Sequence, residues 1–306
     1  MDVIKWDGKP ISKPGIYQNV PMSAYHGQLT VGPSISRSGL WKLFDKSPRH
    51  YFRESYLNPE REEQEESEAL LLGRAAHHAL LGEADFAKHF VIRPEVWDSW
   101  RTKDAKAWKA QQQQAGFDVL EPKHLDQIRG MAAGLNEDPL VRAGILNGLI
   151  EHTIVYQDPE TKVWIKVRPD AIPTDAIDLA DLKTAADISD EGIDNAIGRD
   201  GLYLQGALTG TAVRTVVGQP VNDFALVFVE KADPFCSRVK LLKPADLALG
   251  ELTARVALDM FKRCLDSSQW PGPGGRSGDA GYAEMKPYQR AKIERRILIM
   301  QQELST

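Results

Sequence analysis

The stretch Val163–Lys183, VWIKVRPDAIPTDAIDLADLK, decides how this chain folds and which chemistry it can carry. Its apolar and β-branched residues predict two strands, from about 163 to 169 and from about 176 to 184. The first strand ends at Asp170, which therefore lies beside the second strand at one edge of the predicted sheet. The pair of strands brings polar residues that are distant in sequence to one place.

Side chains alternate between the two faces of a strand, so the second strand sorts its residues into two sets. Asp181 and Lys183 point to one face, whereas Ala180 and Leu182 point to the other. With Asp170, this gives two carboxylates and one ammonium at one sheet edge. Carboxylate oxygens bind Mg²⁺, and a lysine there can steady an attacking water or a phosphate charge. The alternative is that these residues are only solvated groups at strand ends.

A hairpin precedes this site and supplies a third carboxylate. Residues 151–170 alternate in polarity on both sides of a turn centred near Glu160. Antiparallel pairing about that centre places Glu151 opposite Pro169, next to Asp170. Glu160 lies at the far tip, so we expect Glu151 to serve the site and leave any role of Glu160 open.

Composition narrows the class of protein. The chain has 306 residues, 42% hydrophobic and 26% charged, with a net charge of -5, which excludes a strongly basic protein that coats nucleic acid. Its two cysteines, Cys236 and Cys264, are too few for a four-thiolate zinc or iron–sulfur site. The sequence shows neither an apolar signal core at its start nor a run of about 18 apolar residues. We therefore expect a soluble, cytoplasmic protein with no membrane partner.

Two helix signals come before the hairpin. Ser36 is a good N-cap for the segment that follows, and Ser38 adds a second hydroxyl beside Arg37. This start suits a phosphate, although the serines can equally well be caps alone. Residues 68–81 predict a strong helix in which Gly73 stands one turn before His77. A histidine on such a helix is either a core residue or a ligand.

These motifs resemble the PD-(D/E)xK nuclease superfamily. Pro169-Asp170 matches its PD, and 181–183 matches its DxK. Gly73-x-x-x-His77 matches a motif that the RecB-like branch carries upstream, where the histidine contacts metal. The resemblance implies an α/β restriction-endonuclease-like core with a mixed central sheet flanked by helices, and it favours the ligand interpretation of His77.

Two longer stretches, IVYQDPETKVWIKVRPD and DLKTAADI, are similar to the RecE (exonuclease VIII) family of phage recombination exonucleases. The similarity extends over roughly residues 15–272. It implies an enzyme that digests linear double-stranded DNA from the 5′ end with Mg²⁺, for which Mn²⁺ can substitute. The 3′ tails that remain would serve a single-strand annealing protein, and the enzyme would form a ring trimer or tetramer.

The same resemblance assigns roles to individual residues. The implied metal ligands are His77, Asp170, Asp181 and the Leu182 carbonyl. The implied catalytic residues are Lys183, Asp181, Asp170, Glu151 and Gln205. The implied 5′-phosphate-binding residues are Ser36, Arg37 and Ser38. The family's tyrosine one turn after the glutamine is absent, because Thr209 stands there, so the role of Tyr203 stays open.

We therefore expect a nuclease domain over 1–272, followed over 273–306 by a flexible linker and a helical tail. Two alternatives remain open. A PD-(D/E)xK endonuclease would carry the same motifs but would also cut circular DNA. A DNA-binding recombination scaffold would need no hydrolysis and would tolerate the loss of Lys183.

Overall fold

A computed structural model describes residues 2–62, 67–82, 86–173, 178–221, 223–274 and 282–304. The chain divides into two units, Met1–Trp270 and Pro271–Thr306. The start of the second strand expected at residues 176 and 177 lies outside the described residues. None of the helices in the described ranges is long and apolar enough to cross a membrane.

The first unit contains two five-stranded sheets, both with parallel and antiparallel pairs. The first sheet has the order β1 (Val3–Lys5), β2 (Gly15–Gln18), β7 (Thr153–Gln157), β8 (Trp164–Val167), β3 (Ser34–Ser36). The second has the order β12 (Ser237–Leu241), β11 (Phe224–Glu230), β10 (Leu179–Ala185), β9 (Ala171–Ile172), β6 (Leu149–Ile150). A small sheet pairs β4 (Phe90–Ile92) with β5 (Asp118–Leu120). The expected mixed α/β architecture is confirmed.

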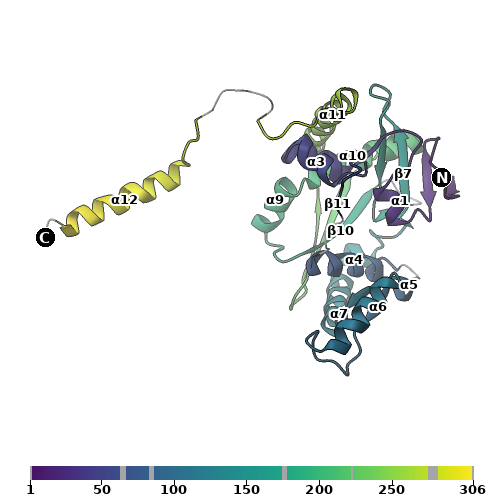
Figure 1. Cartoon of the computed structure of the whole chain (residues 1–306), viewed down its shortest axis with the longest axis horizontal. Coiled ribbons are helices and arrows are strands. Elements are labelled where there is room, and N and C mark those ends of the chain that lie inside the picture. The colour runs from purple at the N-terminus through teal and green to yellow at the C-terminus, as the bar shows by residue number, and fades with distance from the viewer. Residues whose placement is uncertain are drawn as a thin grey trace. The chain divides into compact units, whose positions relative to one another are not determined.

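Helices cover both faces of the second sheet (Figure 1). On one face lie α2 (Arg37–Asp45), α3 (Pro48–Glu54), α10 (Leu202–Val217) and α11 (Pro244–Ser267). On the other lie α4 (Glu68–Leu80) and α7 (Pro122–Glu137). The shorter helices are α1 (Met22–His26), α5 (Phe86–His89), α6 (Lys103–Gln114), α8 (Pro139–Arg142) and α9 (Asp190–Arg199). The second unit carries α12 (Pro287–Leu304).

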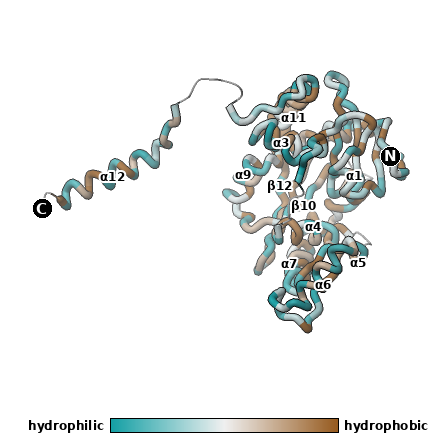
Figure 2. The backbone as a smooth tube through the Cα atoms, viewed as in Figure 1, coloured by the Kyte–Doolittle hydropathy of each residue, from teal (hydrophilic) through white to brown (hydrophobic). Residues whose placement is uncertain are grey.

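The strand β10 contributes to a different core on each face. Ala180 and Leu182 pack with α4 and α7, whereas Leu179 packs with α2 and α10. Asp181 and Lys183 share the side of Leu179, as the alternation predicted. Figure 2 shows hydrophobic segments among the central strands and hydrophilic segments on α3 and α6. Burial on both faces explains why the first half of this strand, residues 179–182, is apolar except at Asp181.

The hairpin β7–β8 is shifted slightly from the expected register. Ile154 pairs with Val167, so the same register continued to the end of the hairpin sets Glu151 opposite Asp170 rather than Pro169. The Glu151 N–H donates to the Asp170 carbonyl at 3.2 Å. The expected centre at Glu160 was half a residue early, and the correction brings Glu151 closer to Asp170.

Helices α10 and α11 approach closely at Gly250, and this contact provides a test of the packing that holds α10. A Cβ at Gly250 would lie 2.5 Å from the Tyr203 carbonyl oxygen and 2.6 Å from the Ala207 Cβ. We expect Gly250→Ala to lower the free energy of unfolding by about 1–3 kcal/mol in urea titrations, because the helices must separate. Gly198 of α9 has open space around it, so Gly198→Ala should instead stabilise by about 0.5–1 kcal/mol. Equal effects of the two substitutions would contradict this account.

Candidate active site

Asp170 lies where the two large sheets meet, between the end of β8 and the start of β9. Its side chain is buried, and each carboxylate oxygen has a different neighbour. Oδ2 accepts a hydrogen bond of 2.5 Å from the Leu182 N–H. Oδ1 lies 3.4 Å from Nδ1 of His77 on α4. The Asp170 carboxylate thus connects the PD segment, the DxK strand and the helix that carries the histidine.

Glu151 joins this pair. One nitrogen or oxygen ligand atom from each of His77, Glu151 and Asp170 lies within 4.8 Å of the other two. Glu151 has a φ of 53°, an uncommon value for glutamate. An imidazole nitrogen with two carboxylate oxygens is a donor set that divalent metal ions accept, so these residues fit a metal ion.

Asp181 lies outside that group of three and is held by two other side chains. It is 1% exposed, and its Oδ1 accepts a hydrogen bond of 2.5 Å from Nε2 of Gln205 on α10. Its Oδ2 forms an ion pair with the Lys183 ammonium, although this buried oxygen accepts no hydrogen bond of normal geometry from the described residues. Lys183 is therefore the charged partner of this oxygen, while Gln205 is the hydrogen-bond donor to the other oxygen.

The pKa values of Asp170 and Asp181 shift in opposite directions. Burial raises the pKa of Asp181, and the Asp170 charge raises it further, against the lowering effect of Lys183. Burial also acts to raise the pKa of Asp170, but His77, Lys183 and the Leu182 N–H together hold that pKa below its usual value. A cation at this site would favour the ionised form of both carboxyls. The charges therefore agree with the donor set in favouring a metal ion.

Gln205 is also held at its other end. Its Oε1 accepts a hydrogen bond of 3.1 Å from Nη2 of Arg37, and Nη1 of Arg37 donates to the Asp200 carbonyl at 3.1 Å. Tyr203 instead packs its ring edge-to-face against Trp41 of α2, with 6.0 Å between the ring centroids. That packing gives Tyr203 an anchoring role between α10 and α2.

The other two residues expected at a phosphate, Ser36 and Ser38, line a cavity of 320 Å³. Ser36 Oγ accepts a bond of 3.4 Å from the Gly39 N–H and is the N-cap of α2, as predicted. The Ser36 and Ser38 hydroxyls lie 3.0 Å apart. Four basic side chains share the lining, His26, Lys42, Arg61 and Lys166, with one acidic residue, Glu54, which forms an ion pair with Lys42. The guanidinium of Arg37, by contrast, is directed to Gln205 and Asp200.

Lys166 is one of the cavity residues that sequence reasoning missed. It stands in the middle of β8, is 3% exposed and donates to the Gly27 carbonyl at 3.2 Å. Its ammonium lies over the rings of Tyr25 and Tyr56, 5.5 and 5.1 Å from their centroids. Burial lowers the pKa of Lys166 to about 8. The available signal was a lysine inside the apolar run VWIKV, where a charged side chain needs a specific reason to be buried.

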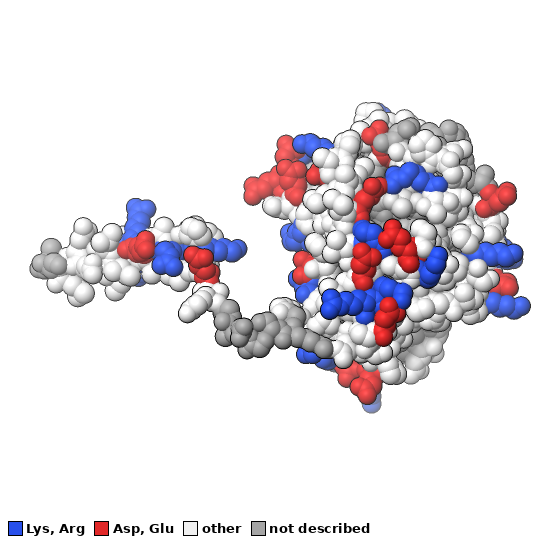
Figure 3. Space-filling model, turned by 90° about the horizontal axis from the view of Figure 1, so that it is seen from above, with Lys and Arg blue, Asp and Glu red and all other residues white. Residues whose placement is uncertain are grey.

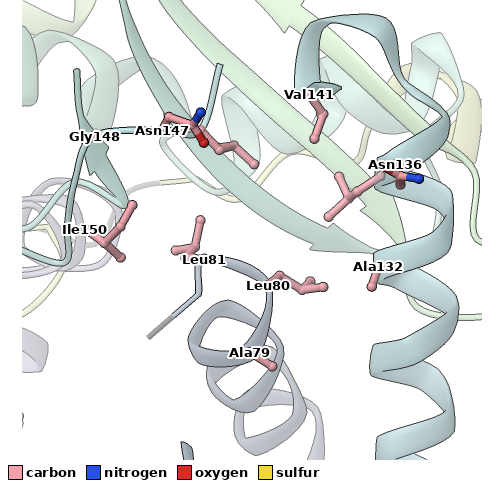
Figure 4. A pocket seen from close by; sticks show the side chains of 11 residues that line it. Ala79, Leu80, Leu81, Ala132, Asn136, Val141, Asn147, Gly148 and Ile150 are labelled. Carbon is pink, nitrogen blue, oxygen red and sulfur yellow. The ribbon is translucent and has the colours of Figure 1, made fainter. Parts of the chain in front are cut away.

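A larger cavity of 560 Å³ opens beside the C-terminal end of α4 (Figure 4). Its apolar wall consists of Leu80 at the end of α4, the following Leu81, Val141 and Ile150. The amides of Asn136 and Asn147 also line it. Among the described residues, the lining contains no charged side chain that could bind a polyanion. The carboxylates described above lie instead around His77 of α4.

Surface charge does not identify a substrate by itself. Figure 3 shows basic and acidic side chains interleaved on the face that it presents. On that face no broad basic region stands apart from acidic groups. Recognition of an anion there would depend on local groups rather than on the field of a whole face.

Comparison with solved structures relates this fold to known proteins. The crystal structure of a candidate exonuclease from Eubacterium rectale is similar, with a TM-score of 0.55, 16% identity, and coverage of 87% of this chain and 92% of that chain. A second structure, of a protein designated SSO0001, has a TM-score of 0.27, 14% identity, and coverage of 65% of this chain and 88% of that chain, too low a similarity to carry an argument. No curated protein matches this chain in sequence.

A family model provides the assignment. Residues 36–284 match the model described as a PDDEXK-like domain of unknown function (DUF3799). The matched range contains the PD and DxK segments and both helices that carry His77 and Gln205. With a match over most of its length and a concordant fold, this chain belongs to the family of PDDEXK-like domains of unknown function.

Proposed function

We propose that this protein is a Mg²⁺-dependent nuclease that hydrolyses DNA phosphodiesters, and that it works as a 5′→3′ exonuclease on linear duplexes. The observation that carries the proposal is the Asp181–Lys183 ion pair beside the group formed by His77, Glu151 and Asp170. A carboxylate cluster with an adjacent ammonium suits hydrolysis of a phosphate ester, because the cluster binds a cation and the ammonium faces the phosphate charge.

In this proposal the metal ligands are His77, Glu151, Asp170, Asp181 and the Leu182 carbonyl. The bound ion would lower the pKa of water and offset phosphate charge. Lys183 orients the attacking water through its ammonium, which the Asp181 carboxylate holds in place. Gln205 braces Asp181 from the opposite side. His77 comes from α4, Gln205 from α10, and Asp181 and Lys183 from β10. The packing of the two helices on this strand therefore sets the distances between these side chains.

The preference for a DNA end rests on the cavity at the start of α2. Two hydroxyls, from Ser36 and Ser38, and the buried ammonium of Lys166 would receive a terminal 5′ phosphate. A phosphate monoester carries more negative charge than a diester. Glu54 offsets the Lys42 charge, but Lys166 and Arg61 also line the cavity, and their positive charges favour an end over an internal position. An endonuclease is the second candidate, and circular DNA distinguishes the two.

The wider biological setting follows the resemblance to the RecE family. Resection would leave 3′ single-stranded tails for a single-strand annealing protein. A ring of three or four copies would keep the enzyme on its substrate. The annealing partner and the ring are both proposed from that sequence similarity.

Removal of the catalytic lysine provides the first test of the activity. We expect Lys183→Ala to lower the rate of DNA cleavage by about 10²–10⁴-fold, because the ammonium that orients the water is lost. Cleavage should be measured on a linear duplex, with circular dichroism to verify the fold. Lys240→Ala, which removes a surface ion pair with Asp190, is the matched control and should cut normally. Full activity of Lys183→Ala would refute the proposed site.

Metal dependence forms a separate test. We expect EDTA to stop cleavage, and Mg²⁺ or Mn²⁺ to restore it, because the carboxylate cluster needs a cation to bind the phosphate. His77→Ala should raise the Mg²⁺ concentration needed for half-maximal activity, while Asn136→Ala in the apolar cavity should leave it unchanged. Cleavage that persists in EDTA would exclude this mechanism.

The DNA-end preference can be tested with three substrates of one sequence: a linear duplex with 5′ phosphate, one with 5′ hydroxyl, and a closed circle. We expect the phosphorylated end to be cut fastest and the circle to stay intact. Lys166→Met, which keeps the apolar stem but removes the charge, should reduce the preference for phosphate about tenfold or more. Ser38→Ala should reduce it less. Cutting of the circle would instead favour the endonuclease.

A further inference from the structure

We propose that Arg37 is a positioning residue that holds Asp181 in place by fixing the side-chain amide of Gln205. The proposal rests on the proposed nuclease function, which it deepens. Arg37 lies at the first position of α2, far from Asp181 in sequence. Its guanidinium bonds to Gln205, and Gln205 bonds to Asp181, so the three form one continuous chain of hydrogen bonds.

The first step of the argument is the direction of the amide. A guanidinium carries donors only, so Arg37 can pair with Oε1 of Gln205 but not with its NH₂ group. With Oε1 held at 3.1 Å by Arg37, the amide nitrogen must face the other way, where it donates to Asp181 Oδ1 at 2.5 Å. The reversed amide would place its oxygen against the Asp181 carboxylate. Arg37 therefore excludes the orientation that repels Asp181.

The second step is that Arg37 itself is anchored. Its Nη1 donates to the carbonyl of Asp200, which ends α9. The next residue, Gly201, has a φ of 65°, and a Cβ there would lie 2.6 Å from the Trp41 ring. That close approach fixes the turn between α9 and α10 against α2. The guanidinium thus bridges two rigid elements, and its position is transmitted to Gln205 on α10.

The third step concerns the carboxylate. Asp181 is held on one oxygen by Gln205 and on the other by Lys183. If Gln205 turned, the Asp181 carboxylate could rotate, and Lys183 would lose the partner that aims it. Arg37 would then influence the reaction without contacting DNA or metal. In metal sites, groups that orient a ligand commonly account for about 10–100-fold in activity or affinity.

A double-mutant cycle tests this role. We expect Arg37→Met and Gln205→Leu each to lower kcat by about 10–100-fold, with KM for DNA changed less than about twofold. Because Arg37 acts through Gln205, the double variant should be no slower than Gln205→Leu alone. Arg37→Lys should recover part of the rate, since an ammonium can still donate to Oε1. Arg214 lies on the same helix as Gln205 and forms an ion pair with Glu251 of α11. Arg214→Met is therefore the matched control and should retain full activity.

Other outcomes would overturn the proposal. If Arg37 bound a DNA phosphate directly, Arg37→Met would raise KM, flatten the salt dependence of DNA binding, and add fully to Gln205→Leu. Failure of the wild-type protein to cut any DNA would refute the proposed function separately. Mn²⁺ titration of the wild type, the two single variants Arg37→Met and Gln205→Leu, and the double variant would then still decide the role of Arg37. We expect about tenfold weaker Mn²⁺ binding for either single variant and no further loss for the double, whereas unchanged binding would refute positioning.

Discussion

The hydrogen bond from the Leu182 N–H to the Asp170 carboxylate joins the two halves of the site, and the remaining contacts depend on it. Asp170 ends the hairpin of the first sheet, and Leu182 lies in the middle of β10 of the second sheet. The bond therefore sets the distance between the end of the hairpin and the centre of β10. With Asp170 fixed, His77 and Glu151 have a common point at which to converge.

Burying these charges requires a well-formed core around them, because an isolated ionised group is costly to remove from water. The second sheet meets that requirement by packing helices on both faces. Leu182 is fully buried towards α4 and α7, while Asp181 is buried towards α10. The carboxylates are in turn compensated by specific donors from Lys183, Gln205 and the Leu182 N–H. The donor from Gln205 is carried by α10, so the packing of α10 directly affects the position of the Asp181 carboxylate.

Local sequence patterns were enough to predict the parts of the site that depend on one strand or one hairpin. Period-two alternation placed Asp181 and Lys183 together, and turn chemistry brought Glu151 to Asp170 within one residue of the observed register. The contacts of Arg37 and Lys166 were not predictable in this way. Arg37 meets Gln205 across the packing of α2 on α10, and Lys166 is enclosed by α1 and the loop after it. Periodicity within a segment carries no information on which helices become neighbours.

The start of α2 lies between the cavity lined by Ser36 and Ser38 and the carboxylate site around Asp181. Ser36 and Ser38 face the basic cavity, whereas the intervening Arg37 is directed to Gln205 and Asp181. The side chains of successive residues at the start of a helix point in different directions. Three consecutive residues can therefore reach both the cavity and Gln205. A ligand in the cavity would therefore rest on the same backbone that anchors the guanidinium. The β3 strand that leads into α2 pairs with β8, the strand that carries Lys166 and ends near Asp170, so one short segment fixes the cavity relative to the carboxylates.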